Sequence, residues 1–184
     1  HVQKWHASGF TELRLTVNLA AGQFSATNLA ERVRDSLQRE GCPPHAVEVE
    51  ITETSMLRDP QGVGETLAEL RDMGLRVAID DFGTGYSSLS HLKRFPIDTL
   101  KIDKTFVADI LTDKDDTAIV SAVIAMARAL DIEVVAEGVE TEAQRDLLAR
   151  MGCDSYQGYL FSRPLPAGDF EALLLRSNAN TGAQ

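Results

Sequence analysis

The sequence is poor in cysteine and has no long apolar run. Its two cysteines, Cys42 and Cys153, lie far apart and have no metal-ligand spacing around them, so we expect reduced thiols rather than a disulfide or a zinc site. No apolar stretch approaches the roughly 20 residues of a membrane-spanning helix. No signal peptide is recognisable either. These absences favour a cytoplasmic globular protein without direct membrane insertion in this segment.

Positive charge is also scarce. The chain carries 18 Lys and Arg against 28 Asp and Glu, a net charge of -10. This balance disfavours a nucleic-acid polymer or an anionic membrane as partner, because both attract basic proteins. An acidic protein that handles a phosphate substrate needs metal ions or local cations. The chain starts at His1 rather than Met, and its first residues read as the interior of a domain, so we expect a piece of a longer polypeptide.

Strand and helix patterns alternate along the chain. Strands are expected at residues 13–19, 47–51, 76–80, 99–102, 133–136 and 155–157. Helices are expected at residues 28–40, 65–73, 88–94, 117–130, 141–151 and 170–175. This alternation predicts an α/β fold with a parallel sheet and helices outside it. We expect one domain over residues 1–176 and a disordered tail at 177–184, which is small and polar.

Polar residues follow nearly every predicted strand. They are Asn18, Glu50, Asp80, Asp81, Asp103, Glu137 and Gln157. An open doubly wound sheet concentrates its site at one switch point, whereas a closed barrel gathers the ends of many strands around one mouth. The spread over all strands therefore favours a TIM-type (β/α)8-like barrel.

The most informative segment is an apolar strand that ends in Asp80 and Asp81 and continues into the glycine-rich turn Gly83-Thr84-Gly85. Two adjacent carboxylates repel each other and are costly to desolvate unless a cation sits between them. Mg²⁺ or Mn²⁺ is the usual cation for such an oxygen-rich site. The segment therefore predicts metal-dependent chemistry at the carboxyl end of a strand.

A closed barrel would bring Asn18, Glu50, Asp80, Asp81 and Glu137 together. This donor set suits one or two divalent cations, the arrangement used for phosphodiester hydrolysis.

Lys101 would point into the same mouth and stabilise the attacking water or the charge developing on phosphate. Taken singly, each residue has an ordinary explanation: a turn for the Asp pair, an ion pair for either glutamate, a solvent-facing lysine. The set as a whole is a more specific indicator of metal-dependent phosphodiester hydrolysis than any single residue in it.

The motifs together resemble the EAL-domain family of cyclic di-GMP phosphodiesterases over residues 5–166. The residues that carry the resemblance are Thr16-Val17-Asn18-Leu19, Glu50-Ile51-Thr52-Glu53-Thr54, Asp80-Asp81-Phe82-Gly83-Thr84-Gly85-Tyr86-Ser87-Ser88-Leu89, Leu100-Lys101-Ile102-Asp103, Ala136-Glu137-Gly138-Val139-Glu140 and Tyr156-Gln157-Gly158-Tyr159.

The resemblance implies a role for each site residue. Metal ligands would be Asn18, Glu50, Asp80, Asp81 and Glu137, with Glu137 and Lys101 as the catalytic pair. The loop after Asp81, with Gly83, Thr84 and Gly85, would be held by Glu53, and the site would be supported by Asp103 and Glu140. Substrate would contact Gln157, Phe161, Arg163 and Pro164. The implied partners are cyclic di-GMP and a second copy of the chain, in a homodimer, with sensor or cyclase domains upstream.

One departure from the family pattern concerns the Glu-Ala-Leu motif of the first strand, which is absent before Asn18. The letters recur at Glu171-Ala172-Leu173, inside a predicted helix, and we treat them as coincidence. We therefore expect an incomplete barrel that lacks its first strand and helix, with an open edge and exposed apolar surface. The expected function is hydrolysis of cyclic di-GMP to linear pGpG in bacterial signalling. The alternative is a catalytically impaired module that binds the nucleotide and relays the signal.

Overall fold

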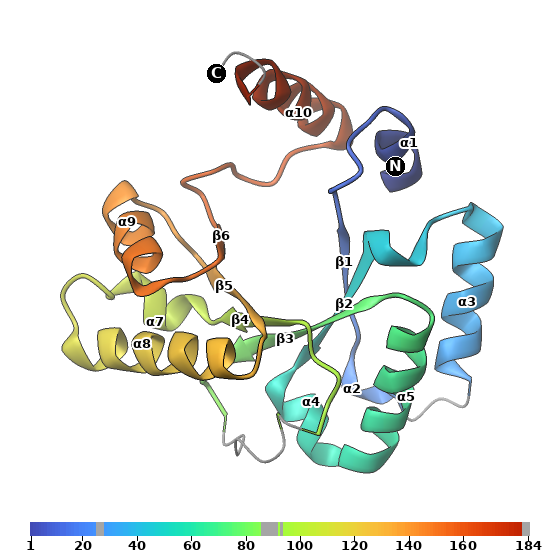
Figure 1. The fold of residues 1–184 in the computed structure, drawn as a ribbon, viewed down its shortest axis with the longest axis horizontal. Helices are drawn as coiled ribbons and strands as arrows, with labels where there is room; N and C mark the ends of the chain where they lie inside the picture. The colour runs from blue at the N-terminus through green and yellow to red at the C-terminus, as the bar shows by residue number, and fades with distance from the viewer. Residues whose placement is uncertain (25–27, 86–91, 93, 182–184) are drawn as a thin grey trace.

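Six parallel strands form one curved sheet in the computed structural model, which describes residues 1–24, 28–85, 92 and 94–181 (Figure 1). The strands are β1 (Leu15–Asn18), β2 (Val47–Thr52), β3 (Arg76–Phe82), β4 (Thr99–Ile102), β5 (Glu133–Glu137) and β6 (Ser155–Gln157). Their order in the sheet is their order in the chain, so the sheet has no switch point. This topology is that of an incomplete (β/α) barrel, and it confirms the fold expected from the sequence.

Most helices lie on the outer, convex side of the sheet, whereas the first and last helices lie together across the gap between β1 and β6 (Figure 1). The longer ones are α3 (Leu29–Glu40), α5 (Pro60–Asp72), α8 (Lys114–Ala129), α9 (Glu142–Met151) and α10 (Ala167–Thr181). The shorter ones are α1 (Val2–Ala7), α2 (Ala21–Phe24), η1 (Pro44–Ala46), α4 (Glu53–Arg58) and α7 (Lys104–Ala108). The sequence did not predict the short helices, since three to six residues are too few to establish a 3.6-residue period.

Three helix boundaries differ from the prediction. Helix α8 begins at Lys114 rather than 117, because the Asp113 side chain caps it by accepting from the amides of Asp115 and Asp116. Helix α5 begins at Pro60 rather than 65, with Asp59 as its cap. Helix α10 begins at Ala167 rather than 170 and continues to Thr181, into the segment expected to be a tail. The predicted helix at 88–94 falls largely outside the described residues.

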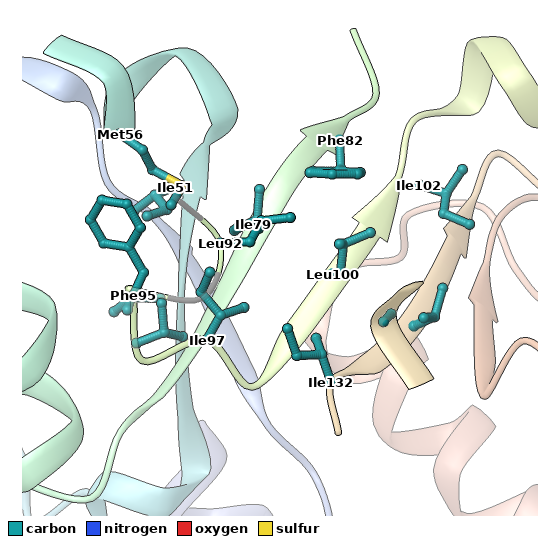
Figure 2. Close-up of a cluster of buried hydrophobic side chains, with 14 of the residues drawn as sticks. Ile51, Met56, Ile79, Phe82, Leu92, Phe95, Ile97, Leu100, Ile102 and Ile132 are labelled. Carbon is teal, nitrogen blue, oxygen red and sulfur yellow. The ribbon is translucent and has the colours of Figure 1, made fainter. Parts of the chain in front are cut away.

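The hydrophobic core lies between the outer face of the sheet and the helices. Ile51, Ile79 and Leu100 project outward from neighbouring strands and are fully buried. Figure 2 shows Met56 of α4, with Phe95 and Ile97 of the segment before β4, gathered around Ile51 and Ile79. Because side chains alternate along a strand, the residues between these apolar ones face the concave side of the sheet. That side carries the polar residues.

Strand β1 forms one edge of the described sheet. Its outward-facing Leu15 and Val17 are 46% and 39% exposed, whereas the equivalent positions of β2, Val47 and Val49, are buried. The apolar edge expected for an incomplete barrel is thus present at β1.

Trp5 of α1 packs against Phe170 of α10 and donates to Glu171, which places the first and last helices side by side (Figure 1).

Among the described residues, no helix combines the length and apolar character needed to cross a membrane.

Candidate metal and phosphodiester site

Lys101 lies at the centre of the carboxylates at the carboxyl ends of the strands. Its ammonium nitrogen is 2.6 Å from Glu50 Oε1, 3.0 Å from Asp80 Oδ1 and 2.6 Å from Glu137 Oε1. The contacts come from β2, β3 and β5, so they depend on the curved sheet rather than on sequence proximity. The Lys101 side chain is only 8% exposed. The lysine thus faces into the concave side, as its position between Leu100 and Ile102 predicts.

Asp80 and Asp81 turn toward the same point although they are adjacent in a strand. Successive strand residues normally point to opposite faces. Here the pairing of β3 with β4 shifts register between Ile79 and Phe82, and Asp81 has a left-handed backbone with φ of 54°. As a result, carboxylate oxygens of Asp80, Asp81 and Glu137 all lie within 4.8 Å of one another. Three hard oxygen ligands at this spacing fit a divalent cation such as Mg²⁺ or Mn²⁺.

Burial and charge perturb the titration of this cluster. Burial raises the pKa of Glu50 and Glu137, and repulsion from Asp80 adds to the effect while Lys101 opposes it. Burial and the neighbouring Asp80 also raise the pKa of Asp81. Burial alone would lower the pKa of Lys101, but its bonds to Glu137 and Glu50 outweigh burial and raise it, so the ammonium stays charged. The cluster therefore holds more carboxylates than its one cation neutralises.

Asp103 supports the cluster from the start of α7. It caps that helix by accepting from the amide of Thr105 at 2.8 Å and from the Thr105 hydroxyl at 2.5 Å. Burial acts to raise the pKa of Asp103, but the two bonds from Thr105 outweigh it, with smaller contributions from the nearby Asp81 and Lys104, and the net shift is downward. Asp103 therefore lies beside Asp81.

Glu53 holds the loop that follows Asp81. Its buried carboxylate accepts from the amides of Gly83 at 3.2 Å and Gly85 at 3.1 Å. Gly83 has φ of 101°, and a Cβ on Gly85 would lie 2.8 Å from the Glu53 carboxyl carbon, so both positions require glycine. The Thr84 hydroxyl donates to the Asp81 carbonyl at 2.8 Å and closes the turn.

Other predicted residues lie around the mouth rather than in the cluster. Asn18 pairs in register with Glu50, and Gln157 with Glu137, so each shares the face of a cluster residue at its strand end. Glu140 is exposed, and its amide donates to Gln144. In the loop after β6, Arg163 stacks 4.3 Å from the Tyr159 ring, and Phe161 is 62% exposed. Pro164 is exposed in the same loop.

A second set of charges on the concave side was missed by the sequence reading. At the amino ends of the strands, Arg76 lies 3.4 Å from Glu48 and 2.6 Å from Glu133. Arg14 lies within 4 Å of the same two glutamates, and the Thr99 hydroxyl donates to Glu48 at 2.6 Å. The signal was available, since Glu48, Arg76, Thr99 and Glu133 alternate with apolar residues on the strands. We use two names for these sets. The ion-pair layer consists of Arg14, Glu48, Arg76, Thr99 and Glu133. The acidic layer consists of Glu50, Asp80, Asp81, Lys101 and Glu137.

The fold and the acidic layer define a β/α-barrel protein with a cluster of carboxylate oxygens at the carboxyl ends of its strands. A family model described as "EAL domain" matches residues 1–164, and the chain belongs to this family.

Curated relatives include two proteins of Pseudomonas aeruginosa. The bifunctional diguanylate cyclase/cyclic di-GMP phosphodiesterase MucR is 47% identical over 163 residues, which cover 89% of this chain and 24% of MucR. The cyclic di-GMP phosphodiesterase NbdA is 43% identical over 169 residues, which cover 92% of this chain and 22% of NbdA. The chain thus spans less than a quarter of the length of these relatives.

Solved structures include the MucR phosphodiesterase in complex with cyclic di-GMP. It superposes with a TM-score of 0.87 at 46% identity, covering 90% of this chain and 67% of that one. The manganese and cyclic di-GMP complex of BlrP1 from Klebsiella pneumoniae superposes with a TM-score of 0.76 at 40% identity, covering 82% of this chain and 39% of that one.

Proposed function

We propose that this chain hydrolyses one phosphodiester bond of cyclic di-GMP to give linear pGpG, with Mg²⁺ or Mn²⁺ in the acidic layer. The observation that carries the proposal is the meeting of Asp80, Asp81 and Glu137 within 4.8 Å, beside the buried ammonium of Lys101. Relatives named as cyclic di-GMP phosphodiesterases and a neighbour solved with manganese and the nucleotide support the choice of substrate and cofactor.

Different residues of the site would bind the cation, stabilise charge on the phosphate and accept a proton. Asp80, Asp81 and Glu137 would hold the cation, with Glu50 and Asn18 at the adjoining strand ends as further ligands. A bound divalent cation lowers the pKa of a coordinated water and polarises phosphate oxygens. Lys101 would balance the negative charge that develops on phosphate. Glu137, whose pKa burial raises, is suited to accept the proton that the attacking water gives up.

Residues around the mouth would bind the nucleotide. The loop after β6 carries Phe161, Arg163 and Pro164 on the surface, and Gln157 lies at the end of β6 next to Glu137. An exposed aromatic ring and a guanidinium offer stacking surfaces for guanine and charge for phosphate. In this proposal, Glu53 and Glu140 act at a distance from substrate, Glu53 through the loop at Gly83 and Gly85.

The wider assembly belongs to the same proposal. We propose a cytoplasmic homodimer in which each copy belongs to a longer signalling protein with sensor or cyclase domains. The outer surface of α8, where Ile119 is 38% exposed, and the preceding Leu111, 50% exposed, offer apolar area for the dimer contact.

The test is a hydrolysis assay with a matched control. The chain is incubated with cyclic di-GMP and Mg²⁺ or Mn²⁺, and pGpG is followed by chromatography for the wild type, the Asp80→Asn/Asp81→Asn variant and an Asp115→Asn/Asp116→Asn variant. The last removes two acids from the exposed first turn of α8. We expect product from the wild type and the α8 variant, and none from the first variant or in the presence of chelator. A wild type that binds the nucleotide and never cleaves it would instead establish the receptor alternative.

A further inference from the structure

The loop after β6 is attached to the segment that follows β5. Val139 lies two residues beyond Glu137, and both of its backbone groups are bonded. Its amide donates to the Gln157 carbonyl at 3.1 Å, and its carbonyl accepts from the amide of Leu160 at 3.0 Å. The Val139 side chain is fully buried in the core, which leaves its backbone little room to move. The two bonds therefore continue the pairing of β5 with β6 into the loop.

This attachment depends on the absence of a side chain at position 158. A Cβ on Gly158 would lie 2.1 Å from the Val139 carbonyl oxygen and 2.4 Å from the Val139 amide nitrogen. Because non-bonded heavy atoms pack more than ~3 Å apart, any side chain would force the two segments about 1 Å away from each other. Gly158 therefore permits a close contact between two backbones that a larger residue would open.

The same contact fixes side chains that lie on the surface at the mouth. The Gly158 carbonyl accepts from the amide of Phe161 at 3.1 Å, which closes a turn. Phe161 is exposed at the end of this turn, and the exposed Arg163 stacks on the Tyr159 ring. The turn and its aromatic and guanidinium groups thus form one unit that is held beside the end of β5.

We propose that Gly158 is a positioning residue for the nucleotide, acting through the Val139 backbone to hold Phe161 and Arg163 at a fixed place relative to the acidic layer. The role rests on the proposed function, because it assumes that this loop binds cyclic di-GMP. A misplacement of about 1 Å can lower the rate of an enzyme by ~10²-fold. Since Val139 is buried and the side chains of the loop are exposed, a Cβ at Gly158 should displace the loop and leave the acidic layer intact.

The test compares two glycine substitutions. Gly158→Ala places a Cβ against Val139, whereas the matched control, Gly168→Ala, adds the same Cβ in α10, where no described residue packed against the helix lies within 4 Å. The KM and kcat for cyclic di-GMP are measured together with Mn²⁺ affinity by electron paramagnetic resonance. For a wild type that binds without cleaving, the Kd of the nucleotide replaces the KM.

The expected result is a selective loss of nucleotide binding. We expect Gly158→Ala to raise the KM or Kd at least ~10-fold, with a smaller change in kcat and no change in Mn²⁺ affinity. Gly168→Ala should match the wild type in every measurement. A role of Gly158 in folding alone would instead change thermal unfolding in chelator without changing the KM of the folded protein.

Hydrogen exchange of the wild type tests the contact without a substitution, and it decides the case if Gly158→Ala does not fold. The amides of Val139 and Leu160 should exchange at least ~10²-fold more slowly than in the unfolded chain before any nucleotide is added, because both are bonded between the two segments. Rapid exchange of the Leu160 amide would show that the loop is not held in place.

The outcomes separate this role from the proposed function. An unchanged KM in Gly158→Ala, or rapid exchange of the Leu160 amide, would overturn the positioning role and leave the proposed function standing. A loss of Mn²⁺ affinity in Gly158→Ala would also overturn it, because the substitution would then act on the cation site. If the wild type binds neither Mn²⁺ nor cyclic di-GMP, the proposed function fails, and the role of Gly158 fails with it.

Discussion

The two charged layers on the concave side of the sheet are built from the same strands and differ in their balance. In the ion-pair layer, the guanidinium groups of Arg14 and Arg76 face the carboxylates of Glu48 and Glu133, so the charges match. In the acidic layer, the single ammonium of Lys101 faces the carboxylates Glu50, Asp80, Asp81 and Glu137. The charges of the ion-pair layer balance, whereas the acidic layer carries more negative than positive charge.

The position of each layer agrees with this difference. In β/α barrels, the carboxyl ends of the strands carry the active site and the amino ends contribute to stability. The acidic layer lies at the carboxyl ends and the ion-pair layer at the amino ends, only two residues away along β2, from Glu50 to Glu48. We therefore expect substitutions in one layer to affect cation binding and hydrolysis, and substitutions in the other to affect folding.

The largest expected effect is on hydrolysis in Asp80→Asn/Asp81→Asn. Losing both carboxylates removes two of the three clustered cation ligands, and we expect activity to fall at least ~10³-fold, about 4 kcal/mol of transition-state stabilisation. The thermal stability measured in chelator should change little, because the substitutions relieve repulsion between the carboxylates. Chromatography of pGpG and thermal unfolding measure the two effects. Retained activity would show that the acidic layer is not the reaction centre.

Lys101→Met tests whether the lysine is the resident cation of the acidic layer. Removing a buried ammonium leaves three carboxylates without it, and we expect a loss of about 3 kcal/mol of unfolding free energy in chelator. Added Mn²⁺ should restore part of that loss, since it supplies positive charge to the same oxygens. Chemical denaturation with and without Mn²⁺ measures the loss of unfolding free energy and the part of it that Mn²⁺ restores. The exposed Lys114→Met serves as control, and equal stability of the two variants in chelator would contradict the prediction.

Arg76→Met tests the other layer. It breaks contacts to Glu48, Glu133 and Thr99, and since the side chain is partly exposed we expect a loss of about 2 kcal/mol of unfolding free energy. Mn²⁺ affinity and hydrolysis by the folded protein should stay near wild-type values. Arg39→Met, which breaks an exposed pair with Glu40 on α3, should cost far less. A large loss of Mn²⁺ affinity in Arg76→Met would remove the distinction between the layers.

The smallest effect is the pH dependence of stability without metal. Burial raises the pKa of Glu50, so the folded protein takes up this proton at a higher pH than the unfolded chain does. The stability that this group contributes is present at acid pH and is lost as the pH rises through its folded-state pKa. Relative to Glu50→Gln, the chelated wild type should gain stability as the pH falls from 7 toward the ordinary carboxylate range. The opposite slope would mean that Lys101 dominates over burial at this site.

The sequence predicted the sheet, its direction and most of the acidic layer for identifiable reasons. Apolar alternation places Lys101 opposite Leu100 and Ile102, and the carboxyl ends of parallel strands meet at one edge, which brings Glu50 and Glu137 to it. The left-handed backbone of Asp81 was not predictable from the pattern, because it depends on a register shift between β3 and β4.

Two further features were beyond the local sequence pattern. The position of Asp103 beside Asp81 requires helix α7, which is too short to give a periodic signal. The pairing of Arg76 with Glu48 and Glu133 joins three strands, and only their register brings the side chains together. Contacts between distant strands depend on the tertiary structure, whereas the direction of the strands and the burial of their residues can be predicted from local sequence patterns.

The most direct test of the comparison is a Mn²⁺ titration of three proteins side by side, by electron paramagnetic resonance: the wild type, Asp80→Asn/Asp81→Asn and Arg76→Met. We expect the wild type and Arg76→Met to bind Mn²⁺ with similar affinity, and the acidic-layer variant not to bind it. Equal binding by all three proteins, or none by the wild type, would contradict the claim that the unbalanced acidic layer is a divalent-cation site.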